Sequence, residues 1–164
     1  LATMMIPTQV TMIPLFVVMN RMGLIDSYAS VILPSVFRPF AVFMLVQQMR
    51  TIPNDFLDAA RIDGANVFQV FRKVALPLCV PSLATLSITT FMESWNDYLW
   101  QLIMIADKGL RTTPIGIALF SQGQITNTGY QLMAAMIATL PMLIIFLSCQ
   151  KFFVKGITIG GVKG

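Results

Sequence analysis

The chain alternates between long apolar stretches and shorter segments that hold most of its charged residues. The apolar stretches cover residues 2–20, 28–49, 80–104 and 131–150. A helix needs about 20 mostly apolar residues to cross the hydrocarbon core of a bilayer, and each stretch is close to that length. The pattern therefore predicts four transmembrane helices.

Several prolines lie inside these predicted spans, among them Pro7, Pro14, Pro34, Pro39 and Pro141. A transmembrane helix tolerates proline because neighbouring helices and ordered waters satisfy the backbone groups that it leaves free. The sequence therefore predicts an all-α integral membrane protein in which about four transmembrane helices pack into a polytopic bundle.

Composition supports a location in the membrane. Hydrophobic residues make up 56% of the chain and charged residues 11%, whereas about 25% of the residues of an ordinary soluble domain are charged. The sequence holds no histidine, and Cys79 and Cys149 stand alone in apolar runs. It therefore predicts no metal site, no disulfide framework and no cofactor.

The basic residues favour one orientation in the membrane. Four spans place residues 50–76 and the C-terminal end on the same side, and that side carries Arg50, Arg61, Arg72, Lys73, Lys151, Lys155 and Lys163. The opposite loops carry Arg21, Lys108 and Arg111. Cytoplasmic loops are enriched in Lys and Arg, so residues 50–76 and the C-terminus are predicted to be cytoplasmic and residues 105–130 external. The net charge of +4 is explained by this rule, and no nucleic-acid partner is expected.

The segment 53–77 is charged and contains two short helical patterns joined by a glycine. Asn54 is a suitable N-cap for the first helix, and Asp55 near its start and Arg61 near its end both suit the helix dipole. Gly64 follows, where a helix commonly ends on a residue with a left-handed backbone. The segment is predicted to form a cytoplasmic helix–turn–helix.

The second helix of this segment has an apolar side, and Leu76-Pro77 is predicted to end it. The apolar residues at helical spacing are Val67, Phe68, Val70, Phe71 and Val74. Three interpretations compete: the helices cap the bundle, lie in the lipid interface, or bind a cytoplasmic partner. Basic interfacial helices carry far more Lys and Arg than this one, and periodicity alone favours the cap over docking.

The sequence "DAARIDGANVFQVFRKVALP" resembles the EAA loop of ABC importer permeases. That motif reads Glu-Ala-Ala, three residues, Gly, nine residues, Ile, any residue and Leu-Pro. Its positions fall at Asp58, Ala59, Ala60, Gly64, Val74, Leu76 and Pro77. Asp58 replaces the usual Glu with one methylene less of reach, and Val74 replaces the usual Ile. The long fixed spacing makes this motif specific.

The resemblance extends over essentially all of the chain. The stretches "MIPTQVTMIPLFVVMNRMGLIDSYASVILP", "SWNDYLWQLI" and "CQKFFVKGITIGGVKG" are similar to carbohydrate-uptake permeases of the maltose and multiple-sugar type. Six spans are usual in that family, so residues 1–164 are expected to form one transmembrane domain that holds the last four. The first residue is Leu1 rather than Met, which also fits a chain truncated at its N-terminus.

The resemblance implies a transport subunit rather than an enzyme. The chain has no G-x-x-x-x-G-K-[ST] phosphate loop, so a separate ATPase subunit would hydrolyse ATP. The loop would sit in a cleft of that subunit, with Asp58 paired to a basic residue and flanked by Arg61. Ala59 and Ala60 would permit close packing, Gly64 would make the turn, and Leu76-Pro77 would lead back to the membrane.

The family also implies a role for the C-terminal tail and a set of partners. The tail at residues 156–164 would reach toward an ATPase dimer, although a frayed terminus is an equally good interpretation. The residues concerned are Gly160, Gly161, Lys163 and Gly164. The expected partners are a cytoplasmic ATP-binding subunit dimer, a second permease subunit, an extracytoplasmic solute-binding protein and the lipid bilayer of the cytoplasmic (inner) membrane.

Acidic residues in the third predicted span are candidates for a translocation path, because intramembrane acids are costly and usually functional. Glu93 is the better candidate, while Asn96 and Asp97 lie nearer the outer boundary, where Asp97 suits a structural hydrogen bond. Arg38 could pair with Glu93, but nothing in the sequence places them together. An ABC permease for another small solute, a secondary transporter and a membrane scaffold are the alternative functions. A secondary transporter would need a repeat and intramembrane ion ligands.

Overall fold

The computed structural model describes residues 2–120 and 128–161, and the side chains only as far as residue 150. Every regular element in this part of the chain is helical, which confirms the all-α class. The elements are η1 (Ala2–Met5), α1 (Thr8–Arg21), α2 (Tyr28–Val36), α3 (Pro39–Arg50), α4 (Asn54–Ile62), α5 (Val67–Val70), η2 (Phe71–Ala75), α6 (Leu76–Leu78), α7 (Val80–Asn96), α8 (Leu99–Met104), η3 (Lys108–Leu110), α9 (Thr113–Leu119) and α10 (Thr128–Gly161).

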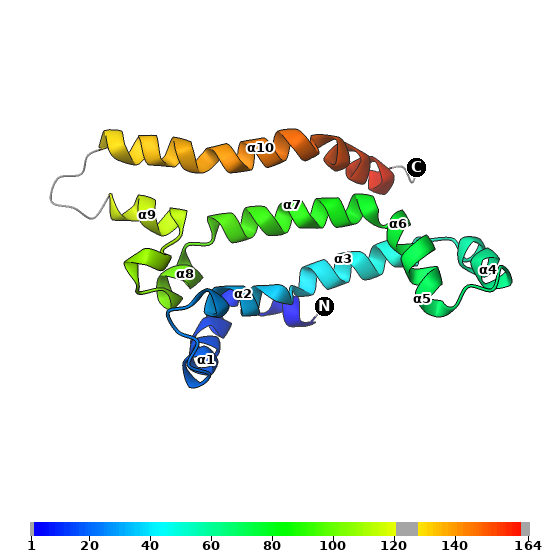
Figure 1. The fold of residues 1–164 in the computed structure, drawn as a ribbon, viewed down its shortest axis with the longest axis horizontal. Helices are drawn as coiled ribbons and strands as arrows, with labels where there is room; N and C mark the ends of the chain where they lie inside the picture. The colour runs from blue at the N-terminus through cyan, green and yellow to red at the C-terminus, as the bar shows by residue number, and fades with distance from the viewer. Residues whose placement is uncertain (1, 121–127, 162–164) are drawn as a thin grey trace.

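Three long rods lie side by side and define the long axis of the molecule (Figure 1). The first is formed by α2 and α3, the second by α7 and the third by α10; α7 contacts both α3 and α10. The short helices α4, α5 and α6 gather at one end, and α8 and α9 lie at the other. The C-terminal end of α10 lies at the same end as α6, as the sequence predicts.

The number of single-helix spans differs from the sequence prediction. Within the described residues, two helices are long and apolar enough to cross a membrane, Tyr28–Arg50 and Thr128–Gln150. A third span exists if Val67–Leu78 and Val80–Asn96, which meet at 70°, are counted as one bent helix. The prediction of a continuous span at residues 2–20 is wrong, because Pro7 separates η1 from an α1 of only 14 residues.

The predicted span 80–104 is also interrupted. Helix α7 ends at Asn96, where Asp97 has an extended backbone (φ −68°, ψ 112°), and the chain re-enters a helix only at Leu99. A polar Asn96-Asp97 pair competes for backbone hydrogen bonds and so favours a break over a helix interior. The span therefore stops eight residues before position 104, at the point where its polar residues gather.

The break between α2 and α3 follows directly from the sequence. A residue that precedes proline is pushed out of the helical region by the pyrrolidine ring. Arg38 precedes Pro39 and is extended at φ −103° and ψ 115°, while Pro39 occupies the first turn of α3, where its missing N–H is harmless. The two helices remain close enough to one line to count as a single span of 23 residues.

A cluster of buried hydrophobic residues lies at the α8 end of the molecule. It consists of Met19 from α1, Trp100 and Met104 from α8, and Ile105, which follows α8. The indole Nε1 of Trp100 donates to the carbonyl oxygen of Ser30 at 3.2 Å, which ties α8 to α2. A buried indole N–H needs such a partner, so this bond fixes how α8 folds back on the bundle.

Candidate coupling and translocation sites

The first helix of the charged segment forms where the sequence predicts it. Helix α4 has Asp55 in its first turn and Arg61 in its last turn, in agreement with the helix dipole. The prediction of Asn54 as N-cap is wrong, because Pro53 occupies that position and Asn54 is already helical. The guanidinium of Arg61 contacts the carboxylate of Asp58 at 2.8 Å, and both side chains are exposed.

Gly64 makes the turn by the mechanism that the sequence indicates. Gly64 has φ +82°. Its N–H donates to the carbonyl of Arg61, and the N–H of Ala65 donates to the carbonyl of Ala60, each at 3.0 Å. This pair of bonds is a Schellman motif, which satisfies the last carbonyls of a helix. A Cβ atom placed on Gly64 would meet no atom within 4 Å. The need for glycine is therefore a matter of backbone conformation and not of crowding.

The second helix of the segment begins with a cap that the sequence analysis missed. The Asn66 side chain accepts from the N–H of Gln69 at 2.9 Å, and the Gln69 side chain accepts from the N–H of Asn66 at 2.8 Å. This reciprocal pair is the capping box, with Asn and Gln in place of the more usual Ser and Glu. The signal in the sequence was that Gln69 follows Asn66 at position i+3.

The second helix does not end at Leu76-Pro77 as predicted. It continues from α5 through one turn of π-helix, η2, into α6, and ends at Leu78 with Cys79 as its C-cap. In the wider π turn the N–H of Leu76 donates to the carbonyl of Phe71. Pro77 directly follows this turn, so its missing N–H falls where the α-helical bonding is already interrupted. The bend of 70° then separates this helix from α7.

The charged segment exposes most of its apolar side chains. Of the five residues predicted to form one apolar side, only Val70 is buried, while Val67 is 84% and Phe68 67% exposed. Phe56 and Ile62 from α4 and Phe71 are exposed as well, and these five side chains form the exposed apolar set of the segment. These side chains are not buried against the other described residues of the chain.

The C-terminal tail is only partly within the described residues. The backbone of Gly160 and Gly161 belongs to the last turn of α10, while Lys163 and Gly164 lie outside the part of the chain that the structure describes. Helix α10 therefore reaches the end of the molecule that holds α4, α5 and α6 (Figure 1).

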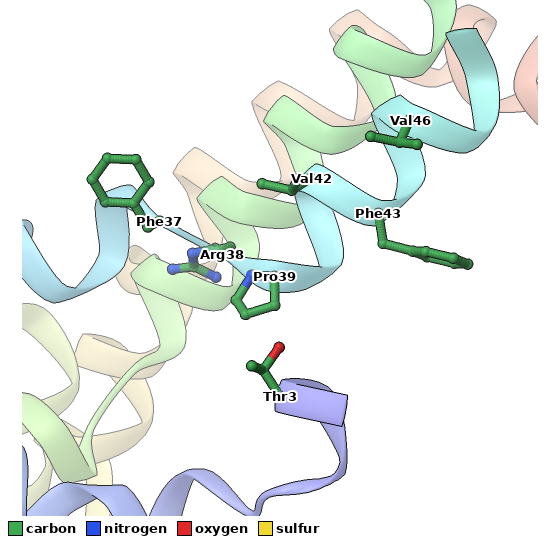
Figure 2. A pocket seen from close by; sticks show the side chains of 7 residues that line it. All are labelled: Thr3, Phe37, Arg38, Pro39, Val42, Phe43 and Val46. Atoms are coloured by element: carbon green, nitrogen blue, oxygen red, sulfur yellow. The ribbon is translucent and has the colours of Figure 1, made fainter. Parts of the chain in front are cut away.

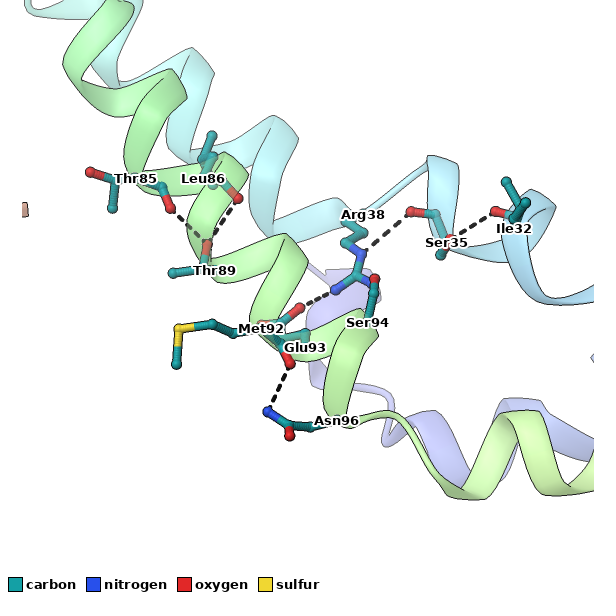
Figure 3. Close-up of polar contacts among 10 residues, drawn as sticks. All are labelled: Ile32, Ser35, Arg38, Thr85, Leu86, Thr89, Met92, Glu93, Ser94 and Asn96. Carbon is teal, nitrogen blue, oxygen red and sulfur yellow. Dashed lines mark hydrogen bonds and ion pairs between the residues drawn. The ribbon is translucent and has the colours of Figure 1, made fainter. Parts of the chain in front are cut away.

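Arg38 and Glu93 are brought together, which the sequence could not establish. Arg38 projects from the link between α2 and α3 toward α7 (Figure 3). Its Nη1 pairs with Glu93, its Nη2 donates to Ser94 Oγ at 2.8 Å, and its Nε donates to the carbonyl of Ser35 at 3.4 Å. One guanidinium thus bridges the broken helix and α7.

The three candidate path residues, Glu93 and Asn96 of α7 and Asp97 directly after it, line one cavity of about 690 Å³. Asn96 Nδ2 donates to the carbonyl of Met92 at 2.9 Å, and Asp97 Oδ1 accepts from the N–H of Trp100 at 3.4 Å. The latter bond matches the structural role expected for Asp97. Arg38 also lines this cavity, together with three threonines of α1 and η1.

A smaller hollow of about 410 Å³ lies between η1 and α3 and shares Arg38 with the first cavity (Figure 2). Its wall is mainly apolar and consists of Thr3, Phe37, Arg38, Pro39, Val42, Phe43 and Val46. The aromatic ring of Phe37 is 83% exposed. Arg38 therefore lines both spaces.

Asp26 is a structurally important residue that the sequence analysis missed. It has φ +59°, rare for a residue other than glycine. Its carboxylate accepts from the N–H groups of Ala106 and Asp107 at 2.9 and 2.8 Å, and its own N–H donates to the carbonyl of Met104 at 2.9 Å. The contact joins the loop after α1 to the loop after α8, and only a folded structure reveals it.

Comparison with known proteins identifies the family. Residues 1–159 match the sequence profile described as "Binding-protein-dependent transport system inner membrane component". The chain therefore belongs to this family of inner-membrane transport components, which are not themselves enzymes.

Curated relatives cover the whole chain at substantial identity. The arabinooligosaccharides transport system permease protein AraQ of Bacillus subtilis is 41% identical over 164 residues, which is 100% of this chain and 58% of that protein. The sn-glycerol-3-phosphate transport system permease protein UgpE of Salmonella typhimurium is 40% identical over 157 residues, 94% of this chain and 56% of that protein. The chain thus spans somewhat more than half the length of the relatives it matches.

A solved structure shares the fold. It is the crystal structure of a bacterial ABC transporter involved in the import of the acidic polysaccharide alginate, with a TM-score of 0.69 and 23% sequence identity. The match covers 86% of this chain and 55% of that one. At this identity the likeness supports the fold alone, and it agrees with the helical bundle described above.

Proposed function

We propose that the chain is part of a permease subunit of a binding-protein-dependent ABC importer, which passes a sugar or oligosaccharide inward across the cytoplasmic membrane. The family match and the relative named for arabinooligosaccharides support this function. The structural observation that carries it is the helix–turn–helix at one end of the bundle, with its exposed apolar set.

The end of the molecule that holds α4, α5 and α6 faces the cytoplasm in this proposal and binds an ATPase subunit. An ATPase cleft would bury the exposed apolar set of Phe56, Ile62, Val67, Phe68 and Phe71. Interfaces have such apolar centres with polar groups around them. Asp58 and Arg61 form an exposed ion pair in the same segment, and their charges are available to basic and acidic residues of the partner.

Movement of the docked segment would reach the translocation path through continuous backbone. Helix α5 runs through the π turn and α6 to the bend at Cys79, and α7 leads from there to Glu93, Asn96 and the following Asp97, which line the cavity. A rigid helical connection transmits displacement better than a loop does, because its backbone hydrogen bonds resist bending. Leu76 and Pro77 would act in this connection rather than in the docking surface itself.

The remaining partners follow from the same function. ATP hydrolysis would take place in a dimer of cytoplasmic subunits, a second permease would complete the bundle, and an external binding protein would deliver the solute. The end of α10 beside α6 would put the glycine-rich tail near the ATPase dimer.

The decisive experiment uses two glycines with the same backbone requirement. Gly64 and Gly23 have φ +82° and +67°, and a Cβ atom added to either one would meet no other atom within 4 Å. Valine at either site should therefore cost a similar conformational energy, roughly 1–2 kcal/mol. Only Gly64 lies in the charged segment 53–77, which we call the docking segment, whereas Gly23 follows α1 at a distance from that segment.

We expect Gly64→Val to lose co-purification of the ATPase subunit and ATP-dependent uptake, and Gly23→Val to retain both. The measurement is made on the full-length permease, expressed with its partner subunits, after confirming that each variant is inserted in the membrane. Full retention of the ATPase by Gly64→Val would contradict the docking function of the segment.

A further inference from the structure

Two groups of helices in this chain are joined by extended backbone. The first, which we call the α8 group, consists of α1, α2 and α8, and the second, the α7 group, consists of α3, α7, α9 and α10. We infer that the α8 group turns as one body against the α7 group about the links between them, and that Arg38 is the latch that holds the groups together. The inference rests on the proposed function, because ATP binding by the partner subunit would drive the movement.

Contacts between segments far apart in sequence hold the α8 group together. Met19 of α1 packs with Trp100 and Met104 of α8, and the indole of Trp100 donates to the carbonyl of Ser30 in α2. Asp26, in the loop between α1 and α2, accepts from two backbone N–H groups after α8. Closely packed and cross-bonded helices resist deformation, so these three move together.

The α7 group has contacts of its own. Helix α7 packs on α3 and α10, and α9 packs on α7 and α10. Ser82 Oγ donates to Gln48 Oε1 at 2.9 Å, which joins α7 to α3, and Trp95 Nε1 donates to the carbonyl of Ala138 at 3.1 Å, which joins α7 to α10. The buried cluster around Met104 lies outside this group. The two groups therefore have separate sets of internal contacts.

The chain passes between the two groups three times from α1 to α9, and every passage has an extended backbone. The links are at Phe37 and Arg38, at Asp97, and at Arg111 and Thr112. At these residues ψ lies between 98° and 166°. A hinge is a short segment that absorbs changes in φ and ψ. The links can therefore turn while the helices on either side keep their hydrogen bonds.

The cavity of about 690 Å³ lies between the two groups. Its lining includes Met12 and Trp100 from the α8 group and Thr89 and Glu93 from the α7 group. Two of the three links line it as well, the first at Phe37 and Arg38 and the second at Asp97. Rotation about these links would therefore change the width of the cavity.

Arg38 crosses between the groups at the first link. Its Nε donates to the carbonyl of Ser35 in α2. Its Nη2 donates to Ser94 Oγ and its Nη1 pairs with Glu93, both in α7 (Figure 3). The Glu93 side chain is 61% exposed, so solvent screens the ion pair and the pair is weak. The contact thus fixes one arrangement of the groups and can still be released.

Gln101 gives a reason for a second arrangement. This residue of α8 is 5% exposed, and its Nε2 donates to the carbonyl of Ser94 in α7 at 3.3 Å. Its Oε1 has no hydrogen-bond partner in the part of the chain that the structure describes. A buried acceptor without a partner destabilises the arrangement that contains it. That cost favours a movement of α8 against α7 in which Oε1 meets a donor.

The test measures distances between pairs of nitroxide labels by electron paramagnetic resonance. It uses the full-length permease in its Cys79→Ser, Cys149→Ser background, assembled with cysteine-free partner subunits. The labels occupy exposed positions: Val17→Cys with Leu102→Cys within the α8 group, Gln47→Cys with Ser87→Cys within the α7 group, and Leu102→Cys with Gln47→Cys between the groups. Between the nucleotide-free state and the state held by ATP and vanadate, we expect the distance between the groups to change by more than about 2 Å and the other two by less.

Pro39→Ala and Pro14→Ala are matched variants for the first hinge. Both prolines are exposed, but Pro39 forces Arg38 out of the helical region, whereas Pro14 lies inside α1 and so within one group. We expect Pro39→Ala to reduce the distance change between the groups by about half or more, because alanine allows a continuous helix there. Pro14→Ala should leave the change as it is in the wild type.

Arg38→Gln tests the latch. We expect it to broaden the distribution of distances between the groups in the nucleotide-free state, since the bonds from the guanidinium to α7 are lost. Arg21→Gln, a change at an exposed arginine that ends α1, should leave the distribution unchanged. An unchanged distribution in Arg38→Gln would contradict the role of Arg38 as latch.

Two results would overturn the movement itself: no change in the distance between the groups, or equal changes in all three distances. A full distance change in Pro39→Ala would contradict the first hinge. If the proline variants do not accumulate, the three distances in the otherwise unchanged protein still decide. Uptake by reconstituted vesicles separates the two proposals. ATP-dependent uptake without a change between the groups contradicts this inference alone, whereas no ATP-dependent uptake contradicts the proposed function.

Discussion

Single residues in this chain hold segments together that are far apart in sequence. Asp26 joins two loops about 80 residues apart with two backbone N–H bonds, and Arg38 joins the α2–α3 link to α7. Gly64, in contrast, acts only on its own turn. This difference explains why the sequence predicted Gly64 and could not place Arg38 or Asp26: the first depends on local backbone geometry and the others on tertiary contacts.

Asp26→Ala should destabilise the protein more than Asp26→Asn. Alanine loses both side-chain bonds and pays the cost of a positive φ, together about 3 kcal/mol. Asparagine tolerates this backbone conformation and keeps an acceptor oxygen, so the loss should be about 1 kcal/mol. Thermal unfolding of the detergent-solubilised protein measures both. Equal unfolding temperatures for the two variants would show that the carboxylate bonds do not hold these loops.

Arg38→Gln should destabilise the protein more than Glu93→Gln. The Arg38 side chain is 23% exposed and has three partners, whereas the Glu93 side chain is 61% exposed and depends mainly on the ion pair. The pair is partly screened by solvent, so its own contribution should be about 1 kcal/mol or less. A double-mutant cycle isolates that contribution from the bonds to Ser35 and Ser94. A coupling energy equal to the whole loss in Arg38→Gln would contradict the role assigned to those serines.

At the scale of elements, the apolar pattern predicted helices well and their interruptions poorly. The spans at 28–49 and 131–150 correspond to Tyr28–Arg50 and Thr128–Gln150, because mainly apolar runs of that length have few alternatives to a helix, even where Pro39 divides the first run into α2 and α3. The span at 80–104 is broken at Asp97. The hydrophobicity averaged over the whole stretch does not reveal such a break, because the break depends on the local Asn96-Asp97 pair.

The π turn of η2 sets the rotation of α7 relative to the docking segment. A π turn contains one residue more than an α turn, so the deletion of Lys73, an exposed residue within it, should restore α-helical geometry and rotate the following helix by about 100°. We expect the deletion variant to retain the ATPase subunit and lose most of its uptake.

Lys73→Ala is the matched control for this deletion, because it removes the same side chain and keeps the backbone length. It should retain uptake. If the deletion variant transports as well as Lys73→Ala, the register between α5 and α7 does not matter for coupling. Co-purification and vesicle uptake, measured on the same preparations, distinguish these outcomes.

At the scale of the whole molecule, the arrangement of the two ends agrees with the charge pattern. The segment α4–α6 and the end of α10 lie together (Figure 1), and α8 and α9 lie at the opposite end. The distribution of Lys and Arg predicts which end is cytoplasmic, and that orientation stays a prediction. Helix α1 is too short to count as a span. It precedes both residues 50–76 and the C-terminal end, so the prediction that these two regions lie on the same side does not change.

Cysteine accessibility tests the orientation directly. In a Cys79→Ser, Cys149→Ser background, we expect a membrane-impermeant maleimide added outside intact cells to label Lys108→Cys and not Asp63→Cys. Both positions are exposed in the structure, so labelling reports the side of the membrane rather than burial. Labelling of Asp63→Cys alone would invert the predicted topology.

The attachment of α10 has a consequence for how the sequence can vary. Within Thr128–Gln150, the most apolar stretch has no buried residue, and Trp95 Nε1 reaches this helix through the carbonyl of Ala138 at 3.1 Å. A backbone carbonyl is present whichever side chain occupies position 138, so this contact limits the size of the side chain there more than its chemical identity. Natural drift should therefore exchange apolar residues freely over most of α10, while small residues persist where α7 approaches. A survey of tolerated substitutions would trace the line of contact between the two helices without any further structure.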